Sequence, residues 1–187
     1  MTLEEIFSQI AQHMVVGLMF HSQACDFFNF LGLKGYSKCH KYHYFEENNN
    51  YKCVCDYYIS HFNKLVIEQP FENPNLIPTN WYRYTRQDMD SATRTTAIKT
   101  GFEKWVQWER DTKKLYEYYY QCLIALNEFA AAFVIKEYIR DVDNELAEAE
   151  QKLLNLESIQ YNISDIMNEQ DEMYEKYLNK LEEIKLC

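Results

Sequence analysis

The sequence contains very little glycine and proline, with 4 and 3 residues respectively among 187. All three prolines, Pro70, Pro74 and Pro78, fall in one central segment, so most residues that break helices are confined there. The rest of the chain is free to form long helices. Because 187 residues are enough to bury a core, we predict a single helical domain over 1–187.

Basic residues are also in short supply. The chain has 19 Lys and Arg against 29 Asp and Glu, which gives a formal net charge of -10. Such a charge opposes binding to a phosphate backbone, which depends on neutralising phosphates with basic side chains. The many aromatic residues have no basic residues arranged around them, so we expect them in the core and expect no nucleic-acid partner.

Long apolar runs are missing as well. The longest nearly apolar run, 122–135, is interrupted by Asn127 and Glu128 and is too short to span a bilayer. No charged-then-apolar leader opens the chain. We therefore expect no membrane association and a cytoplasmic protein, in which the six scattered cysteines are free thiols.

Motifs of several common catalytic classes are absent from the sequence. It has no Gly-rich phosphate loop, no Cys-x-x-Cys pair, and no Ser or Cys in a recognisable nucleophile setting. Nucleotide-dependent and nucleophilic catalysis are accordingly not indicated.

What the sequence does contain is a series of long stretches with apolar residues three and four positions apart, the interval of a helix. The pattern predicts a helix over 3–31, a turn at Gly32 and Gly35, and a second helix from about 36 to 67. A long crossing over 68–90 follows, then two helices separated by a break around Asn127. Short, long and short connections are typical of an all-α four-helix bundle with one crossover.

The end of the chain keeps the helical spacing beyond the predicted bundle. We place the bundle at about 3–157 and an additional C-terminal helical tail at about 158–187, with a possible break over 162–164. This tail is either a fifth packed helix or an arm for oligomerisation.

Acidic residues occupy positions of the apolar stripes that should face inward. Glu109 falls in the apolar series of the third helix, between Trp105 and Thr112, and Glu145 lies at the edge of the stripe of the fourth. A lone buried carboxylate is costly, so it needs a cation, a metal or a proton.

The second predicted helix carries a polar row at intervals of three and four, formed by His40, His43, Glu47 and Asn50. It runs beside an apolar row that begins at Tyr44. In antiparallel helices, residues equidistant from the turn face each other. This rule sets Glu47 opposite Met14, Glu109 opposite Glu145, and His21 close to His40, so side chains from several helices can meet.

Each of these features has a simpler explanation. A row of His and Glu on a Lys-rich helix is often a solvated face. Glu109 could be paired with Lys or Arg, or lie at the edge of the bundle. A histidine on an apolar face is often a hydrogen-bonded core residue.

Three segments resemble parts of ferritins. "GLKGYSKCHKYHYFEE", residues 32–47, is similar to the ferritin turn between the first two helices and the Glu-Glu cluster that follows it. "WVQWERDTKKLYEYYY" resembles the third ferritin helix and "FVIKEYIRDVDNE" the fourth. The similarity covers about residues 4–150 and implies a ferritin-like four-helix bundle with one long crossover and an additional C-terminal helix.

The resemblance also implies a set of iron ligands. The family's carboxylate ligands fall on Glu47, Glu109 and Glu145, while its first-helix Glu falls on Met14 and its second-helix His on Asn50. With His43 one turn before Glu47, the three carboxylates could hold one metal ion or a shifted pair. The resemblance therefore predicts a homo-oligomeric protein that binds iron or another divalent metal. In an active form it would oxidise ferrous ion and store or detoxify iron, and whether it is such a ferroxidase stays open.

Other assignments stay open. Because Met14 and Asn50 replace two ligands, the chain could instead be a non-catalytic ferritin-like bundle for self-association or partner binding. DNA-protecting mini-ferritins share a pattern like Tyr36, His40 and Phe45, but their basic tail has no equivalent here. A di-metal oxygenase would need a repeated Glu-x-x-His signature that this sequence lacks.

Overall fold

The computed structural model describes residues 1–66, 81 and 83–185, and every regular element within these ranges is a helix. The long helices are α1 Leu3–Phe30, α2 Lys34–Phe62, α3 Ser91–Ala125, α4 Phe129–Ser158 and α5 Ile163–Lys185, with a short 3-10 helix, η2, at Arg86–Asp88. The predicted all-α fold is confirmed. None of the described helices combines enough length with enough apolar character to cross a lipid bilayer.

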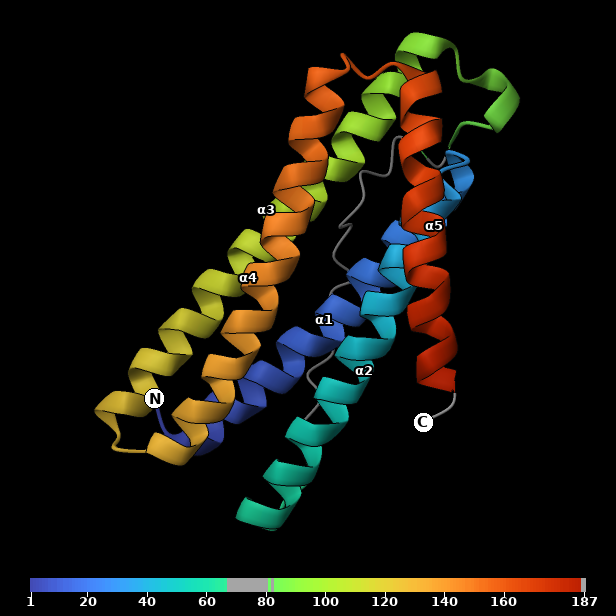
Figure 1. Ribbon diagram of the computed structural model, residues 1–187. Coiled ribbons are helices and arrows are strands. Elements are labelled where there is room, and N and C mark those ends of the chain that lie inside the picture. Colours follow the sequence, from blue (N-terminus) through green and yellow to red (C-terminus); the bar gives the residue numbers. More distant parts are fainter. Residues whose placement is uncertain (67–80, 82, 186–187) are drawn as a thin grey trace.

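Two helical hairpins form the bundle. As Figure 1 shows, α1 and α2 make one hairpin and α3 and α4 the other, while α5 runs beside α2. Helix α1 also packs against α3, which joins the hairpins. The predicted order of short, long and short connections is therefore confirmed, although residues 67–80 and 82 of the crossing lie outside the described part of the chain.

The hairpin turns use left-handed backbone where the sequence allows it. Gly32 has φ +81° between α1 and α2, and the next amide, that of Leu33, donates to the carbonyl of Phe28 at 2.8 Å. Between α3 and α4, Asn127 has φ 61° and ends the predicted third helix where the break was expected. Both are residue types that tolerate this conformation.

Helix α2 differs from the sequence prediction at its end and in its inward face. It stops at Phe62 rather than near 67 because Asn63 adopts a left-handed conformation, φ 52°, and its amide donates to the carbonyl of Ile59 at 2.9 Å. Tyr44, the first member of the expected apolar row, is 36% exposed. The residues buried in this half of the helix include His40 and His43, so the polar row is not a solvated face.

The core consists of two apolar clusters with polar residues between them. One cluster includes Phe28, Cys39 and Trp105, and the other includes Met14 and Tyr116. Along α2 and along α3 the polar side chains that the sequence singled out occur between the members of these clusters. This polar layer is the place to search for a functional site.

The C-terminal tail is a fifth packed helix. Helix α5 lies against α2, and its side chains Ile166, Met173 and Tyr177 are buried. The contact is closest at Gly35, whose amide donates to Gln170 Oε1 at 2.8 Å. The break that separates α5 from α4 covers residues 159–162, close to the predicted one.

Replacing Gly35 by alanine should detach α5. A Cβ atom at Gly35 would collide with the carbonyl oxygen of Gln170 and lie 2.8 Å from the amide nitrogen of Tyr174. Both atoms belong to the backbone of α5, so the helix itself must move, and we expect a loss of about 2 kcal/mol or more in the free energy of unfolding.

Urea unfolding measures the loss, and limited proteolysis within 159–162 reports release of α5. Lys34→Ala is the matched control, because Lys34 is exposed one residue earlier on the same helix. Unchanged stability of the Gly35 variant would contradict the described packing.

Candidate metal centre

Three side chains from two helices bring their ligand atoms together. His43 Nδ1 on α2 lies 3.2 Å from Glu145 Oε1 on α4 and 3.3 Å from Glu46 Oε2 one turn along α2. The ligand atoms of these three residues all lie within 4.8 Å of one another, and no other group of this kind occurs among the described residues. One imidazole and two carboxylates of this spacing could coordinate one ion.

His43 is the buried member of this group, and both of its ring nitrogens lack a hydrogen bond to any described residue. The two contacts of Nδ1 are close ion-pair contacts without hydrogen-bond geometry. Burial lowers the pKa of His43, but Glu145 and the nearby Cys39 raise it more, so that its pKa lies well above the usual value. In the metal-free protein the protonated ring therefore supplies the positive charge among these acids.

Glu47 lies next to Glu46 in the sequence and points into the same region. The pKa of Glu47 is raised to about 8, first by burial and then by the neighbouring Glu145, whose effect exceeds the lowering by His43. Its carboxylate lies close to the backbone of α1 at Gly17. A Cβ atom added at Gly17 would lie only 2.7 Å from Glu47 Oε1. Glycine at position 17 leaves the space that this carboxylate occupies.

Glu109 on α3 is buried, with 1% of its surface exposed. Its Oε1 accepts a hydrogen bond from Trp105 Nε1 at 3.1 Å. Burial raises the pKa of Glu109 well above its ordinary value, and Glu145 and Glu47 add to this effect. Glu145 is thus near enough to Glu109 for its charge to raise the pKa of Glu109, and no described Lys or Arg forms an ion pair with Glu109.

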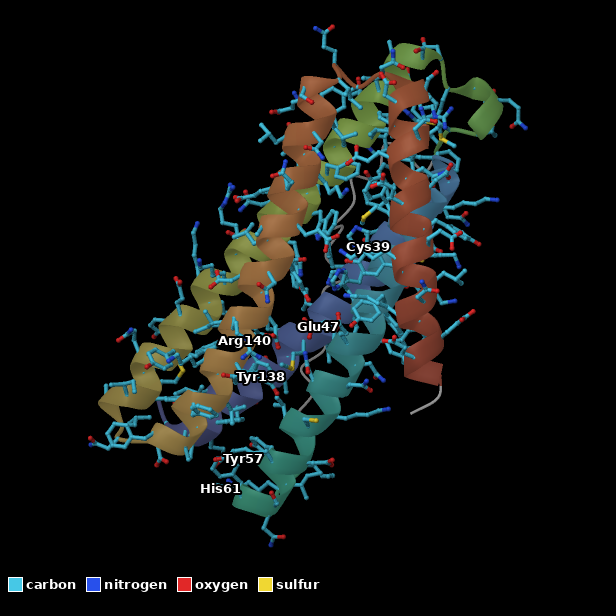
Figure 2. All side chains as sticks on the ribbon, in the orientation of Figure 1. Cys39, Glu47, Tyr57, His61, Tyr138 and Arg140 are labelled. Atoms are coloured by element: carbon cyan, nitrogen blue, oxygen red, sulfur yellow. The ribbon has the colours of Figure 1, made fainter. Side chains whose placement is uncertain are left out.

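A small cavity of about 30 Å³ lies among these side chains. This volume is enough for a water-sized occupant. The cavity is lined by residues from α1, α2, α3 and α4: Met14, His43, Glu46, Glu47, Asn50, Tyr116, Tyr138, Asp141, Val142 and Glu145. Figure 2 shows Glu47 on α2 and Tyr138 on α4 at this level of the bundle, whereas Tyr57 and His61 lie near the far end of α2.

Two other histidines adjoin the site without joining the group of ligands. His21 Nδ1 and His40 Nδ1 are 3.1 Å apart, as expected from their equal distance to the first turn, so one ring donates a hydrogen bond to the other. Burial lowers the pKa of both rings well below the usual value. They form a neutral, buried pair, and the ring of His21 lies 5.4 Å from that of His43.

Helix α5 supplies the surroundings of His43. The ring of Tyr177 lies 5.8 Å from the ring of His43, and its hydroxyl donates to Glu148 Oε2 at 2.8 Å. Tyr42 donates to Glu46 Oε1 at 2.5 Å, and Lys180 Nζ lies 4.4 Å above the Tyr42 ring. Glu46 is thus held by Tyr42, which Lys180 of α5 contacts. The ring of His43 lies beside Tyr177 of α5 itself.

Of the four residues that the sequence proposed as metal ligands, His43 and Glu145 belong to the group of converging ligand atoms. Glu47 lines the same cavity, and Glu109 lies outside its lining but near enough for Glu145 and Glu47 to raise its pKa. Sequence reasoning missed Glu46. The available signal was its spacing, since Glu46 follows His43 by three residues and therefore lies on the same face of α2. It also missed Tyr177, because nothing in the spacing of the tail indicates which helix it contacts.

The residues present fit a divalent metal ion. Carboxylate oxygens and a neutral imidazole nitrogen are ligands of iron, manganese and zinc. Both nitrogens of His43 are free of hydrogen bonds to described residues, and Gly17 leaves room for the Glu47 carboxylate. A cation bound here would replace the protons that His43, Glu47 and Glu109 hold in its absence.

No protein-family model matches the chain, and no curated protein matches it in sequence. Solved ferritin structures do match in fold. An engineered closed form of the Archaeoglobus fulgidus ferritin aligns with a TM-score of 0.71 at 16% identity, covering 93% of this chain and 96% of that one. A humanized archaeal ferritin gives 0.73 at 15%, covering 91% and 94%. An iron-soaked variant of PmFTN gives 0.69 at 11%, covering 90% and 96%.

Proposed function

Because the chain has a ferritin-like fold, we propose that it binds iron or a similar divalent metal at the polar layer of its bundle. The proposed ligands are His43, Glu46, Glu47, Glu109 and Glu145. One observation carries the proposal: Glu46, Glu47 and Glu145 line a small cavity with His43, and no described Lys or Arg forms an ion pair with Glu47, Glu145 or the nearby Glu109. A metal ion would supply the missing positive charge.

The residues of the site have separate roles in this proposal. Glu46 and Glu145 are partly exposed and can take an ion from solvent, whereas Glu109 lies deeper and holds it from the side of α3. His43 gives up its proton when the ion binds and then offers a neutral nitrogen. Ferrous ion, the proposed substrate, would lose an electron to dioxygen, and the carboxylates would stabilise the higher charge of the product.

Metal binding and oxidation can be tested with Glu145→Gln. This substitution keeps the shape of the side chain but removes the charge that faces His43 Nδ1 at 3.2 Å. We expect the wild-type protein to bind ferrous ion without oxygen and to form ferric ion after oxygen is admitted. The variant should bind at least about tenfold more weakly.

Native mass spectrometry with metal analysis measures binding, and ferric absorbance measures oxidation. Lys113–Asp143 offers a matched control, since Asp143→Asn removes an exposed carboxylate of α4 that pairs with Lys113 outside the cavity. Equal metal content in wild type and Glu145→Gln would contradict the proposal.

A second candidate function is a metal-free bundle that serves self-association or partner binding. The observation in its favour is that Met14 and Asn50, which replace two ligands expected from the ferritin resemblance, line the same cavity. Neither side chain carries a charge. Absence of metal from the protein as isolated, together with no uptake of ferrous ion, would select this candidate.

We also propose that the chain forms homo-oligomers through the turn between α3 and α4. Large apolar side chains are exposed there, including Leu126 at 41%, Phe129 at 63% and Phe133 at 65%. Exposed apolar side chains gathered at one place are typical of protein interfaces.

The double variant Phe129→Glu, Phe133→Glu should therefore dissociate the oligomer. Like charges placed in a contact between copies oppose association, and we expect at least a tenfold rise in the dissociation constant. Analytical ultracentrifugation measures it. Leu154→Glu is the control, because Leu154 is 59% exposed on α4 away from the turn. If Leu154→Glu raised the dissociation constant as much as the double variant does, the turn between α3 and α4 would not be the interface.

A further inference from the structure

A second cavity shares no lining residue with the cavity of the acidic layer, and its lining is mainly aromatic. Its volume is about 270 Å³, and it is formed between the C-terminal half of α1 and the segment around Trp81 and Tyr84. The described residues that line it are Gln23, Asp26, Phe27, Phe30, Trp81 and Tyr84. None of them belongs to the candidate metal centre, so an inference from this cavity does not depend on the proposed function.

Four of the six lining residues are aromatic. Phe27 and Phe30 come from α1, one turn apart, and Trp81 and Tyr84 come from the segment that precedes α3. The rings of Trp81 and Tyr84 lie 6.0 Å apart at 39°. The Tyr84 ring already carries a cation, since Arg83 Cζ lies 5.4 Å from its centroid. Aromatic faces concentrate negative potential and attract cations of low hydration.

Two side chains of the cavity offer unpaired acceptor oxygens, and Trp81 Nε1 is a buried donor that has no partner among the described residues. Asp26 is exposed and forms no ion pair with a described Lys, Arg or His, so its negative charge is not compensated within the described part of the chain. Gln23 Oε1 is buried and has no hydrogen-bond partner among the described residues. Among the described residues, no basic one lines the cavity. Its charge pattern therefore favours a positively charged occupant over a neutral or negative one.

We propose that this cavity binds a small organic cation with a quaternary ammonium group. Several aromatic rings beside one carboxylate are the arrangement that recognises such groups, because the cation gains from the ring faces while its methyl groups fill apolar space. The volume lies just below the range of pockets for drug-sized ligands, which suits a compact cation. A metal ion would not be held here, since one carboxylate offers too few ligands.

Choline and its uncharged isostere, 3,3-dimethylbutan-1-ol, form a matched pair of probes. They have nearly the same shape, so the ratio of their dissociation constants isolates the effect of charge. We expect choline to bind at least about tenfold more tightly, as measured by calorimetry and by the change in tryptophan fluorescence. Equal binding of both probes, or no binding of choline, would overturn the proposal.

Two variants locate the binding. Asp26→Asn should weaken choline about tenfold and leave the isostere unchanged, and Trp81→Leu should weaken both and remove most of the fluorescence response. Asp56→Asn, on an exposed position of α2, is the control. Circular dichroism checks folding. If Trp81→Leu does not fold, Asp26→Asn alone decides, and choline binding that is unaffected by it contradicts the proposal.

The same ammonium group occurs in free choline and in phosphatidylcholine headgroups, so a third arm separates these sources. Co-sedimentation of the protein with phosphatidylcholine vesicles, competed by free choline, would assign the lipid. Binding of free choline without co-sedimentation would assign a soluble cation. Vesicle binding that Asp26→Asn does not change would count against the cavity.

Discussion

Replacing Glu47 and Glu109 together by glutamine should abolish tight metal binding and, at high pH, make the metal-free protein more stable. Both carboxylates are held near other acids, and burial raises the pKa of each. Glutamine has the same shape and no charge, so the double variant loses two ligands without leaving a void. We expect at least a hundredfold loss in affinity for ferrous ion.

The effect of this double variant on stability has a sign that depends on pH. The pKa of Glu47, about 8 in the folded protein, lies above its ordinary value of 4.5, so the stability from its bound proton is complete below pH 4.5 and is lost as pH rises through 8. Wild type should therefore lose stability between pH 5 and pH 9, whereas the variant should not. At pH 9 we expect the variant to be more stable by about 2 kcal/mol.

Urea unfolding of the metal-free proteins at pH 6 and pH 9 measures this difference. The control is Glu103→Gln, Glu117→Gln, which removes two carboxylates from exposed positions of α3. A double variant of Glu47 and Glu109 that is less stable than wild type at both pH values would show that these carboxylates are satisfied without a metal.

Gly17→Ala should weaken metal binding while leaving the fold intact. The added Cβ would lie 2.7 Å from Glu47 Oε1 and 3.3 Å from Trp108 Cζ2, so the Glu47 carboxylate has to move away from α1. Alanine is the better helix former by about 1 kcal/mol, which offsets the crowding in the metal-free protein. We expect affinity for ferrous ion to fall about tenfold with little change in the urea midpoint.

A double-mutant cycle assigns this effect to Glu47. In a Glu47→Gln background the Gly17 substitution should have no further effect on metal affinity, because the carboxylate that it displaces is already gone. Additive losses would show that Gly17→Ala acts through Trp108 or through the packing of α1 instead.

Most of the fold could be predicted from the sequence, because its breaks are few and unambiguous. Gly32 and Asn127 ended helices where expected, and the helical spacing located α1, α3 and α4 closely. The end of α2 could not be predicted, since Asn63 takes its left-handed conformation inside a stretch with no Gly or Pro. The assignment of residues 1–187 to one domain and to the cytoplasm remains a prediction.

The candidate site was only partly predictable. Glu109 was detected because a carboxylate in an apolar series has a recognisable cost, and Glu145 because it faces Glu109 across the turn at Asn127. Glu46 was missed because the ferritin resemblance directed attention to Glu47, although the partly exposed Glu46 reaches His43 one turn away on α2. The role of Tyr177 depends on where α5 lies, and helical spacing within a segment does not specify its neighbour.

The polar layer between the two apolar clusters also affects how the bundle opens. Each cluster holds the helices together over its own length, with Trp105 in one and Tyr116 in the other. Without an ion, the level between them holds buried carboxylates whose charged forms are costly, so brief separation of the helices there would let water reach them. Besides the fraying of helix ends that any bundle shows, we expect amide hydrogens at this polar layer to exchange earlier than those of the two apolar clusters, and solvent and a cation would enter there.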